Sequence, residues 1–427
     1  MNVLRVLNII KKNKFASDSL WAVFGNGFGN ALLLLAGIII ARFLGRDLYG
    51  EYGMVKSTMF VIAGFATFGL GWSSTRFIAQ YEKENNHLLH SVGIASLAIS
   101  IFTSTILCLL LFFFSHKLAD YLDQPQLYFP FRILGIIIVI RAVSTVTTSL
   151  LAGFKSFKES GVNNILSGIA MLALSIPLTY YFSLTGALLS LLISQAIFCC
   201  TNLWTWLKID RKLEKQITKN LSKEILLFSF PVALQELSYS LCNWGVAIAI
   251  TKYASLGEMG IYSATAQWNS VVLFIPGLLF NVFLSYMSSS KSDVRIMKKS
   301  LLINFLTAVI PFLLILIFSD YIVKMYGESF NSMKIVLNIM VFSTIFNTLS
   351  NSYVSELLAQ GRNWTLFLLR LFKDFSIFLL ILLDVRINNG TNAALHLAII
   401  TVVSNFVFLI LLILSHKRYE AKCCDYK

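Results

Sequence analysis

Long apolar runs recur along the chain and are separated by short polar connections. A transmembrane helix needs about 20 consecutive apolar residues. Within each run the apolar positions are continuous rather than alternating, which is typical of helices and not of membrane β-strands. The pattern predicts an all-α integral membrane protein of about 12 transmembrane helices. The predicted spans are residues 19–41, 54–75, 89–114, 127–151, 160–181, 184–207, 225–250, 260–287, 300–319, 334–357, 363–383 and 391–414.

The amino-acid composition excludes several classes of protein. Apolar residues make up 57% of the chain and charged residues 13%, whereas soluble domains have about 25% charged residues. A soluble enzyme and a secreted disulfide-rich module are therefore excluded. The polar connections are too short to hold a catalytic domain outside the membrane, and they carry no metal-ligand spacing or phosphate-binding loop. We expect a protein that is not an enzyme and has no metal site and no bound cofactor.

The net charge of +14, from 35 basic and 21 acidic residues, indicates how the chain is oriented in the membrane. Lys and Arg concentrate in the connections on one side of the predicted spans, and membrane proteins keep such connections in the cytosol. We therefore expect a multi-pass protein with both termini cytosolic. Because topology accounts for the charge, nucleic acid is not an expected partner.

The longest basic connection, residues 208–224, divides the spans into two sets of six. We predict an N-terminal six-helix lobe (1–207), a cytosolic basic linker (208–224) and a C-terminal six-helix lobe with a short cytosolic tail (225–427). A faint repeat at an offset of 210 aligns ARFLGRDLYGEYG (41–53) with TKYASLGEMGIYS (251–263). Halves of equal orientation are parallel repeats about an axis along the membrane normal, which predicts pseudo-twofold symmetry between the lobes.

An ordered set of motifs spread over both halves resembles one family, the Wzx-type flippases of polysaccharide repeat units. The motifs are IIIARFLGRDLYGEYG (38–53), FGLGWSSTRFIAQY (68–81), FSFPVALQELSYSLCNWG (228–245), GEMGIYSATAQ (257–267) and MYGESF (325–330).

This resemblance implies the MATE-like fold of the multidrug/oligosaccharidyl-lipid/polysaccharide exporter (MOP) superfamily. It implies a flippase in the bacterial inner membrane that moves undecaprenyl-diphosphate-linked oligosaccharides, destined for O-antigen or a related surface polysaccharide, to the outer leaflet by alternating access. A polysaccharide polymerase and a chain-length regulator are the expected partners. Family members commonly carry an acidic residue in helix seven, where this chain has Asn243 and Trp244 and its nearest acid is Glu236.

A cation-coupled multidrug extruder of the same fold is the alternative. Cationic drugs favour an acidic or aromatic cavity, whereas the charge that we assign to the spans is basic on balance. The flippase is therefore the preferred interpretation.

Ionisable residues inside spans usually face protein or a water-filled cavity. Arg370, Lys373 and Asp374 lie near mid-depth of one span, and Arg370 and Asp374 are one turn apart and can pair. Either an ion pair between Arg370 and Asp374 allows the helix to insert into the membrane, or one basic residue stays unpaired and binds a diphosphate. Arg141 and Arg132 lie on opposite faces of another span, because nine residues correspond to about 180°. We expect Arg141 to face the cavity and Arg132 to lie at headgroup level.

The remaining candidates are acids, amides and residues at helix ends. Glu236, Glu356 and Asp374 are candidates for gating or for coupling to H⁺ or Na⁺, with a salt bridge to a facing helix as the other reading of Glu236. Amide pairs spaced by four residues can line a cavity or join helices; they are Asn26 with Asn30 and Asn347 with Asn351. Arg42 and Arg76 lie at helix ends and are expected at headgroup level.

Overall fold

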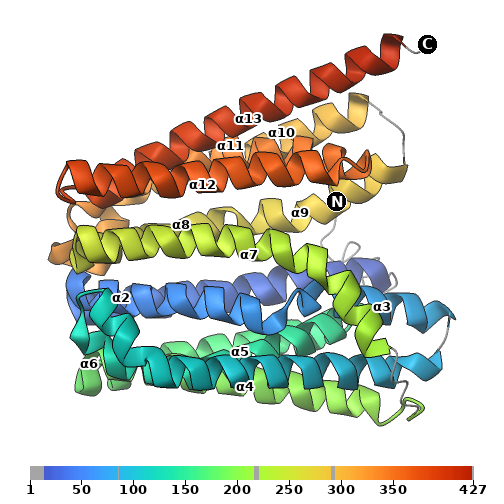
Figure 1. Ribbon diagram of the computed structural model, residues 1–427, viewed down its shortest axis with the longest axis horizontal. Coiled ribbons are helices and arrows are strands. Elements are labelled where there is room, and N and C mark those ends of the chain that lie inside the picture. Colours follow the sequence, from blue (N-terminus) through green and yellow to red (C-terminus); the bar gives the residue numbers. More distant parts are fainter. Residues whose placement is uncertain (1–13, 85, 216–220, 290–293, 426–427) are drawn as a thin grey trace, which may run out of the picture. The chain divides into compact units, whose positions relative to one another are not determined.

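The structure is a computed structural model that describes residues 14–84, 86–215, 221–289 and 294–425. These residues form helices joined by short turns (Figure 1). The helices are α2 (Lys14–Thr67), α3 (Leu70–Glu84), α4 (Leu89–Tyr121), α5 (Tyr128–Gly153), α6 (Phe157–Asp210), α7 (Leu221–Tyr253), α8 (Leu256–Val272), α9 (Phe274–Ser289), α10 (Val294–Tyr326), α11 (Met333–Ala359), α12 (Asn363–Ile387) and α13 (Ala393–Asp425).

The surfaces of these helices carry the apolar side chains expected next to lipid. On α4, Phe102 and Phe113 are 68% and 74% exposed, and Ile317 on α10 is 67% exposed. Inside a bilayer, helices are stable because they satisfy every backbone hydrogen bond internally. Within the described ranges, seven helices are long and apolar enough to cross a membrane. The predicted all-α membrane fold is confirmed.

The predicted spans fall on these helices, with breaks at four places. α2 holds the first span and most of the second, and it bends at Gly45 (φ 70, ψ 175), a conformation that suits glycine. α6 holds the fifth and sixth spans and breaks at Ser183 (φ 52, ψ −130). The second span is interrupted at Phe68 and Gly69, both with positive φ. The eighth is split at Leu273 into helices of 17 and 16 residues.

The chain forms two compact units. The first contains Met1–Phe43 and Val55–Ser240, and the second contains Leu44–Met54 and Leu241–Lys427. The boundary at residues 208–224 stays a prediction, and residues 216–220 of that linker, like residues 1–13 of the N-terminal lobe, lie outside the described ranges.

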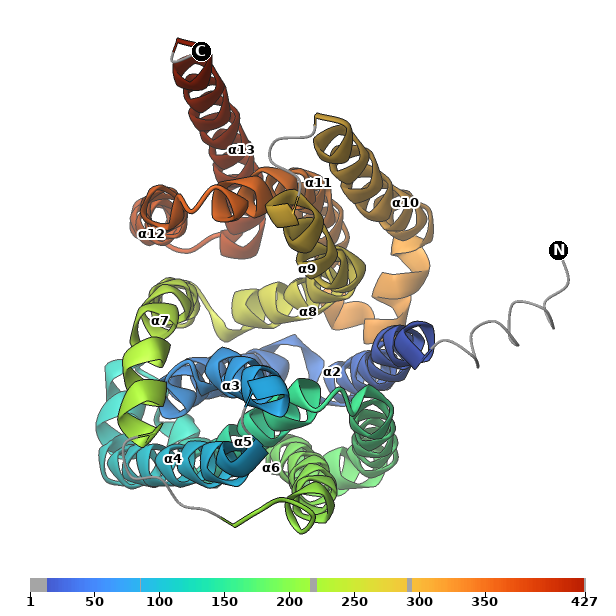
Figure 2. The same cartoon turned by 90° about the vertical axis from the view of Figure 1, so that its right-hand side faces the viewer.

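In the first unit, α5 packs against α3, α4 and α6 (Figures 1 and 2). Its core contains Leu70, Val92, Leu150 and Trp206. The fully buried indole of Trp206 lies where a Cβ atom on Gly93 would be, so this glycine of α4 makes room for a side chain of α6.

In the second unit, α11 is the central helix and packs against α8, α9, α10 and α13. α12 lies alongside α13 (Figure 1). A buried polar contact fixes α10 against α11, because the Asn304 amide and the Ser300 hydroxyl both donate to Ser352 Oγ at 2.8 Å.

The two aligned copies of the repeat touch each other inside the second unit. A Cβ atom on Gly50 would overlap the carbonyl oxygen of Leu256, and one on Gly260 would overlap the carbonyl oxygen of Arg46. Gly50 aligns with Gly260 at the offset of 210, and Arg46 aligns with Leu256. The contacts are thus reciprocal, as they are across a twofold axis, and they explain why Leu44–Met54 packs with the second unit.

The motif MYGESF reaches the same place. The Tyr49 ring lies 6.0 Å from that of Phe330, which lies 5.4 Å from that of Tyr326. The Tyr49 hydroxyl donates to Gln267 Oε1 at 3.2 Å, and the Trp268 indole donates to the Tyr326 hydroxyl at 3.1 Å. Segments far apart in the sequence are therefore joined by ring contacts and hydrogen bonds next to the glycine crossing.

Candidate functional site

A pocket of about 320 Å³ opens in the first unit between α2, α5 and α7. Within each of these helices the lining residues recur every three to four positions, so they share one face. The lining residues are Phe60, Ala63, Gly64 and Thr67 of α2, Arg141 and Thr145 of α5, and Glu236, Tyr239 and Ser240 of α7.

Arg141 supplies a positive charge that neutral partners hold in place. Its Nη1 donates to Oε1 of the buried Gln195 on α6 at 3.3 Å, and its guanidinium lies over the Phe60 ring, 4.9 Å from the centroid. An amide and an aromatic face orient a cation without cancelling its charge. The pocket therefore presents a fixed cation among membrane-spanning helices, which is the environment that an anionic group needs there.

Lys56 adds a second cation near this site, and the sequence analysis missed it. It lies on α2 one turn before Phe60, close enough to Arg141 for the two charges to interact. Lys56, Phe60, Gly64 and Thr67 follow a helical period along one face, and that pattern was the available signal. Gln195 was also missed, because nothing in the sequence pairs it with a residue 54 positions earlier.

Glu236 brings a carboxylate into the same pocket. It is exposed on the α7 side, with Tyr239 and Ser240 on the following turn. The structure thus brings together two residues, Arg141 and Glu236, that the sequence treated as separate candidates. Gly64 faces this part of α7, since a Cβ atom there would lie 3.9 Å from Ser240 Oγ.

A second group of charges lies on α12, in the second unit. Lys373 Nζ lies 3.3 Å from Asp374 Oδ1, and the two side chains are 15% and 10% exposed. Lys373 also lies over the Phe408 ring of α13, 5.1 Å from its centroid. The close ion pair of Asp374 is thus with its neighbour in sequence, while Arg370, one turn earlier, interacts with the same carboxylate electrostatically. Two cations share one carboxylate, so the group keeps a net positive charge.

Glu356 joins two helices of the second unit. Its Oε2 lies 3.1 Å from Nδ1 of His416 on α13, and its Oε1 accepts from the Gln360 amide at 3.3 Å. Just before α12 begins, the Arg362 guanidinium donates to the hydroxyl of Ser415 on α13 at 2.9 Å. These contacts favour a role at the α11–α13 interface.

The four candidate asparagines lie outside the pocket around Arg141. The carbonyl oxygen of Asn26 accepts from the Asn164 amide of α6 at 3.3 Å, so this turn of α2 packs against α6, and Asn30 is half-buried one turn later. On α11, Asn347 and Asn351 are half-buried.

The three arginines expected at headgroup level differ in their surroundings. Arg42 and Arg76 are exposed, and Arg42 lies three residues before the bend at Gly45. The expectation that Arg76 lies at a helix end was wrong, because α3 begins at Leu70 and places Arg76 in its middle. Arg132 is half-buried, with its guanidinium between the rings of Phe112 (4.4 Å) and Tyr128 (4.3 Å).

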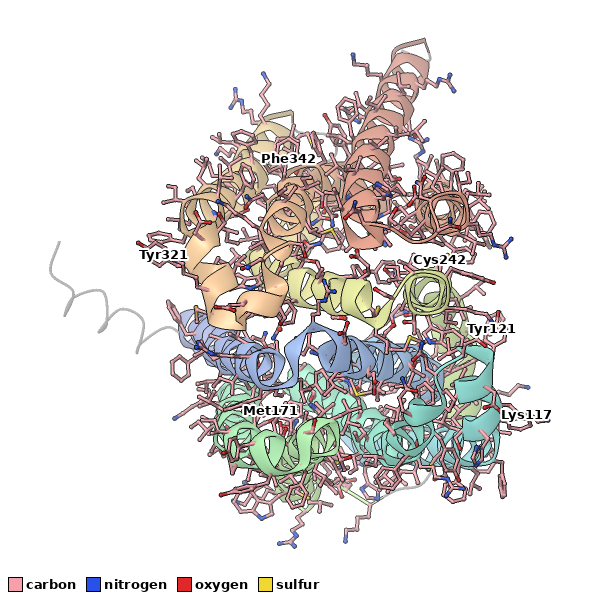
Figure 3. The ribbon with its side chains drawn as sticks, turned by 90° about the vertical axis from the view of Figure 1, so that its left-hand side faces the viewer. Lys117, Tyr121, Met171, Cys242, Tyr321 and Phe342 are labelled. Atoms are coloured by element: carbon pink, nitrogen blue, oxygen red, sulfur yellow. The ribbon has the colours of Figure 1, made fainter. Side chains whose placement is uncertain are left out.

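The His116 ring stacks on the Tyr128 ring with centroids 3.5 Å apart, which adds a third ring to the aromatic groups around Arg132. Lys117 and Tyr121, at the same end of α4, project outward (Figure 3).

A family model described as "Polysaccharide biosynthesis protein" matches residues 15–291. The chain belongs to this family. It is 24% identical over 354 residues to the succinoglycan biosynthesis transport protein ExoT of Rhizobium meliloti (strain 1021), covering 81% of this chain and 69% of the relative. It is 24% identical over 362 residues to a Shigella flexneri protein named for O-antigen transport, covering 81% of this chain and 85% of that one.

Solved structures show that the chain has the fold of MOP superfamily transporters. An inward-facing multidrug resistance MATE transporter has a TM-score of 0.79 at 15% identity, covering 92% of this chain and 95% of that one. The lipid II flippase MurJ in an inward closed conformation has a TM-score of 0.72 at 15% identity, covering 93% and 87%. The names of these relatives and neighbours describe transporters and flippases rather than enzymes, and this chain is a multi-pass membrane protein.

Proposed function

We propose that this protein flips undecaprenyl-diphosphate-linked oligosaccharide repeat units from the cytosolic to the outer leaflet of the bacterial inner membrane. The observation that carries the proposal is Arg141, a cation oriented by the neutral partners Gln195 and Phe60 in a pocket among membrane-spanning helices. Names of relatives refer to succinoglycan and O-antigen transport, which agrees with a lipid-linked glycan as cargo.

The chemistry of the pocket suits the polar part of such a substrate. A diphosphate carries charge that guanidinium and ammonium groups can match, the first through forked hydrogen bonds and the second as a point charge. Arg141 and Lys56 offer one of each near the same pocket. The prenyl chain remains in the hydrocarbon, next to the exposed apolar faces of helices such as α4.

Transport would proceed by alternating access. The fold that this chain shares has been solved in inward-facing and outward-facing conformations of a multidrug transporter. Both termini face the cytosol in our proposal, H⁺ or Na⁺ is the candidate coupling ion, and a polymerase and a chain-length regulator act on the delivered units.

Export of cationic drugs is the second candidate, and it rests on the MATE neighbours and on the carboxylate of Glu236 beside Phe60 and Tyr239. Arg141 and Lys56 oppose it, because they repel a cation from the same space.

The test is complementation of a deletion strain, with surface polysaccharide and prenyl-linked intermediates measured together. Arg141→Ala should abolish long surface chains and cause single repeat units to accumulate on the cytosolic leaflet. Arg42→Ala, which removes an exposed arginine at a helix end, should complement fully. Normal surface polysaccharide in the deletion strain, with new sensitivity to cationic dyes, would move the assignment to drug export.

A further inference from the structure

The pocket around Arg141 contains one group that a diphosphate does not need. Glu236 lines the same cavity of about 320 Å³ as Arg141. A carboxylate repels a diphosphate at this range, so it weakens the binding of that group taken alone. Its oxygen atoms line the pocket as acceptors and can bind a second ligand group that carries hydrogen-bond donors.

The lining of the pocket is divided between two kinds of chemistry. Arg141 and Phe60 form a cationic and aromatic part. The other part contains a carboxylate and two hydroxyl groups, which come from Glu236, Tyr239 and Ser240 within about one and a half turns of α7. An ionised carboxylate only accepts hydrogen bonds, whereas the hydroxyls of Tyr and Ser donate and accept. This combination suits a sugar ring, whose hydroxyl groups donate to carboxylates and accept from hydroxyls.

The two threonines of the lining are already committed as donors. The Thr67 hydroxyl donates to the Gly64 carbonyl at 3.2 Å, and the Thr145 hydroxyl donates to the Arg141 carbonyl at 2.9 Å. Their oxygen atoms remain acceptors. Together with Glu236, they make the pocket rich in acceptors, which again favours a ligand with several hydroxyl groups.

The size of the pocket limits what enters it. Its volume of about 320 Å³ is near the lower end of ligand pockets, which span about 300–1,000 Å³. This volume is enough for a phosphate and one adjoining ring.

We propose that this pocket is a glycosyl-phosphate subsite, in which Arg141 binds the phosphate and Glu236 binds hydroxyl groups of the first sugar. The inference rests on the proposed function and deepens it. Glu236 is then a specificity-determining residue that selects the first sugar of the repeat unit, and the distal sugars are not recognised here.

The experiment measures binding of soluble substrate analogues to the purified full-length protein in nanodiscs by calorimetry. Farnesyl diphosphate is compared with farnesyl diphosphates that carry one hexose, one N-acetylhexosamine, one 6-deoxyhexose or one hexuronic acid. In the wild type, at least one sugar should increase the affinity about tenfold or more over farnesyl diphosphate. In Glu236→Gln that increase should fall below about threefold, while farnesyl diphosphate itself should bind as well as before or more tightly.

Matched variants distinguish the effects of charge, of pocket volume and of folding on binding. Arg141→Gln should lose binding of every analogue, sugar-bearing or not. Gly64→Leu should fill the pocket without changing charge and should remove the sugar increment, whereas Gly64→Ala places a Cβ atom at an ordinary 3.9 Å from Ser240 Oγ and should preserve it. Ser238→Ala is the control on α7, because its hydroxyl donates to the Leu234 carbonyl and lies outside the pocket lining.

The outcomes distinguish this inference from the proposed function. If farnesyl diphosphate binds but no sugar adds affinity, or if Glu236→Gln keeps the increment, the subsite is wrong and the flippase proposal stands. The subsite is also wrong if Glu236→Gln changes only the dependence of binding on Na⁺ or pH, which indicates ion coupling. If no prenyl diphosphate binds the folded wild type and cationic dyes do, the proposed function itself fails.

Discussion

Gly50 and Gly260 pack backbone to backbone, and a Cβ atom on Gly260 would lie 3.2 Å from the Gly50 nitrogen. The two residues are equivalent positions of the repeat, and each also approaches the carbonyl of the other's neighbour one turn earlier, Arg46 or Leu256. Small residues at such a crossing let helices approach closely in a membrane. The two glycines therefore have a packing role, which is visible only when the facing helix is seen beside each of them.

Alanine at either glycine should destabilise this crossing. Gly50→Ala or Gly260→Ala forces a methyl group into backbone atoms of the facing helix. We expect a loss of about 1–3 kcal/mol, the usual cost of overpacking, seen as a lower thermal unfolding midpoint in detergent. Gly277→Ala is the matched control, because nothing lies within 4 Å of its Cβ position. Equal midpoints in all three variants would contradict the packing role.

Lys56 should contribute to anion binding without being essential for folding. Lys56→Gln keeps a polar side chain and removes the charge next to Arg141. We expect an affinity for farnesyl diphosphate about tenfold lower, since charged hydrogen bonds are worth about 1.5–3 kcal/mol, with an unchanged unfolding midpoint. Titration calorimetry with Arg76→Gln as a charge-matched control tests this. Unaltered affinity in Lys56→Gln would exclude Lys56 from the site.

Asp374 should stabilise the second unit through its ion pair. Asp374→Asn leaves Lys373 and Arg370 as like charges on one side of α12 without a counter-ion. Breaking a buried pair by removing one partner costs about 3–5 kcal/mol, so the unfolding midpoint should drop markedly.

The double variant Lys373→Met with Asp374→Leu tests whether the ion pair is the cause of this loss. Replacing both charges by apolar residues should recover much of the lost stability, which a double-mutant cycle measures. A midpoint for the double variant as low as that of Asp374→Asn would show that the pair is not the cause.

Arg132 should matter for stability and Arg141 for transport. Arg132→Ala removes contacts with two aromatic rings, which are worth about 0.5–2 kcal/mol each depending on how far the cation is desolvated. We expect a lower unfolding midpoint and retained complementation of a deletion strain. Loss of complementation at normal expression would instead give Arg132 a direct part in transport.

The apolar runs alone predicted the membrane helices, because spanning a bilayer requires an uninterrupted apolar segment of a known length. The repeat at an offset of 210 was also visible, since it consists of local motifs. The break at Ser183 lies in the predicted gap between the spans 160–181 and 184–207, whereas the breaks at Phe68–Gly69 and at Leu273 fall inside predicted spans.

The residues that come together around the pocket could not be predicted from the sequence. Arg141, Glu236, Lys56 and Gln195 come from four helices, and no local pattern links residues so far apart. Likewise, spacing made Arg370 the expected partner of Asp374, but side-chain packing against Phe408 put Lys373 closest to it. Periodicity reports which face of a helix a residue occupies, whereas the neighbour of that face depends on how the helices pack, and so the pocket emerged only from the folded chain.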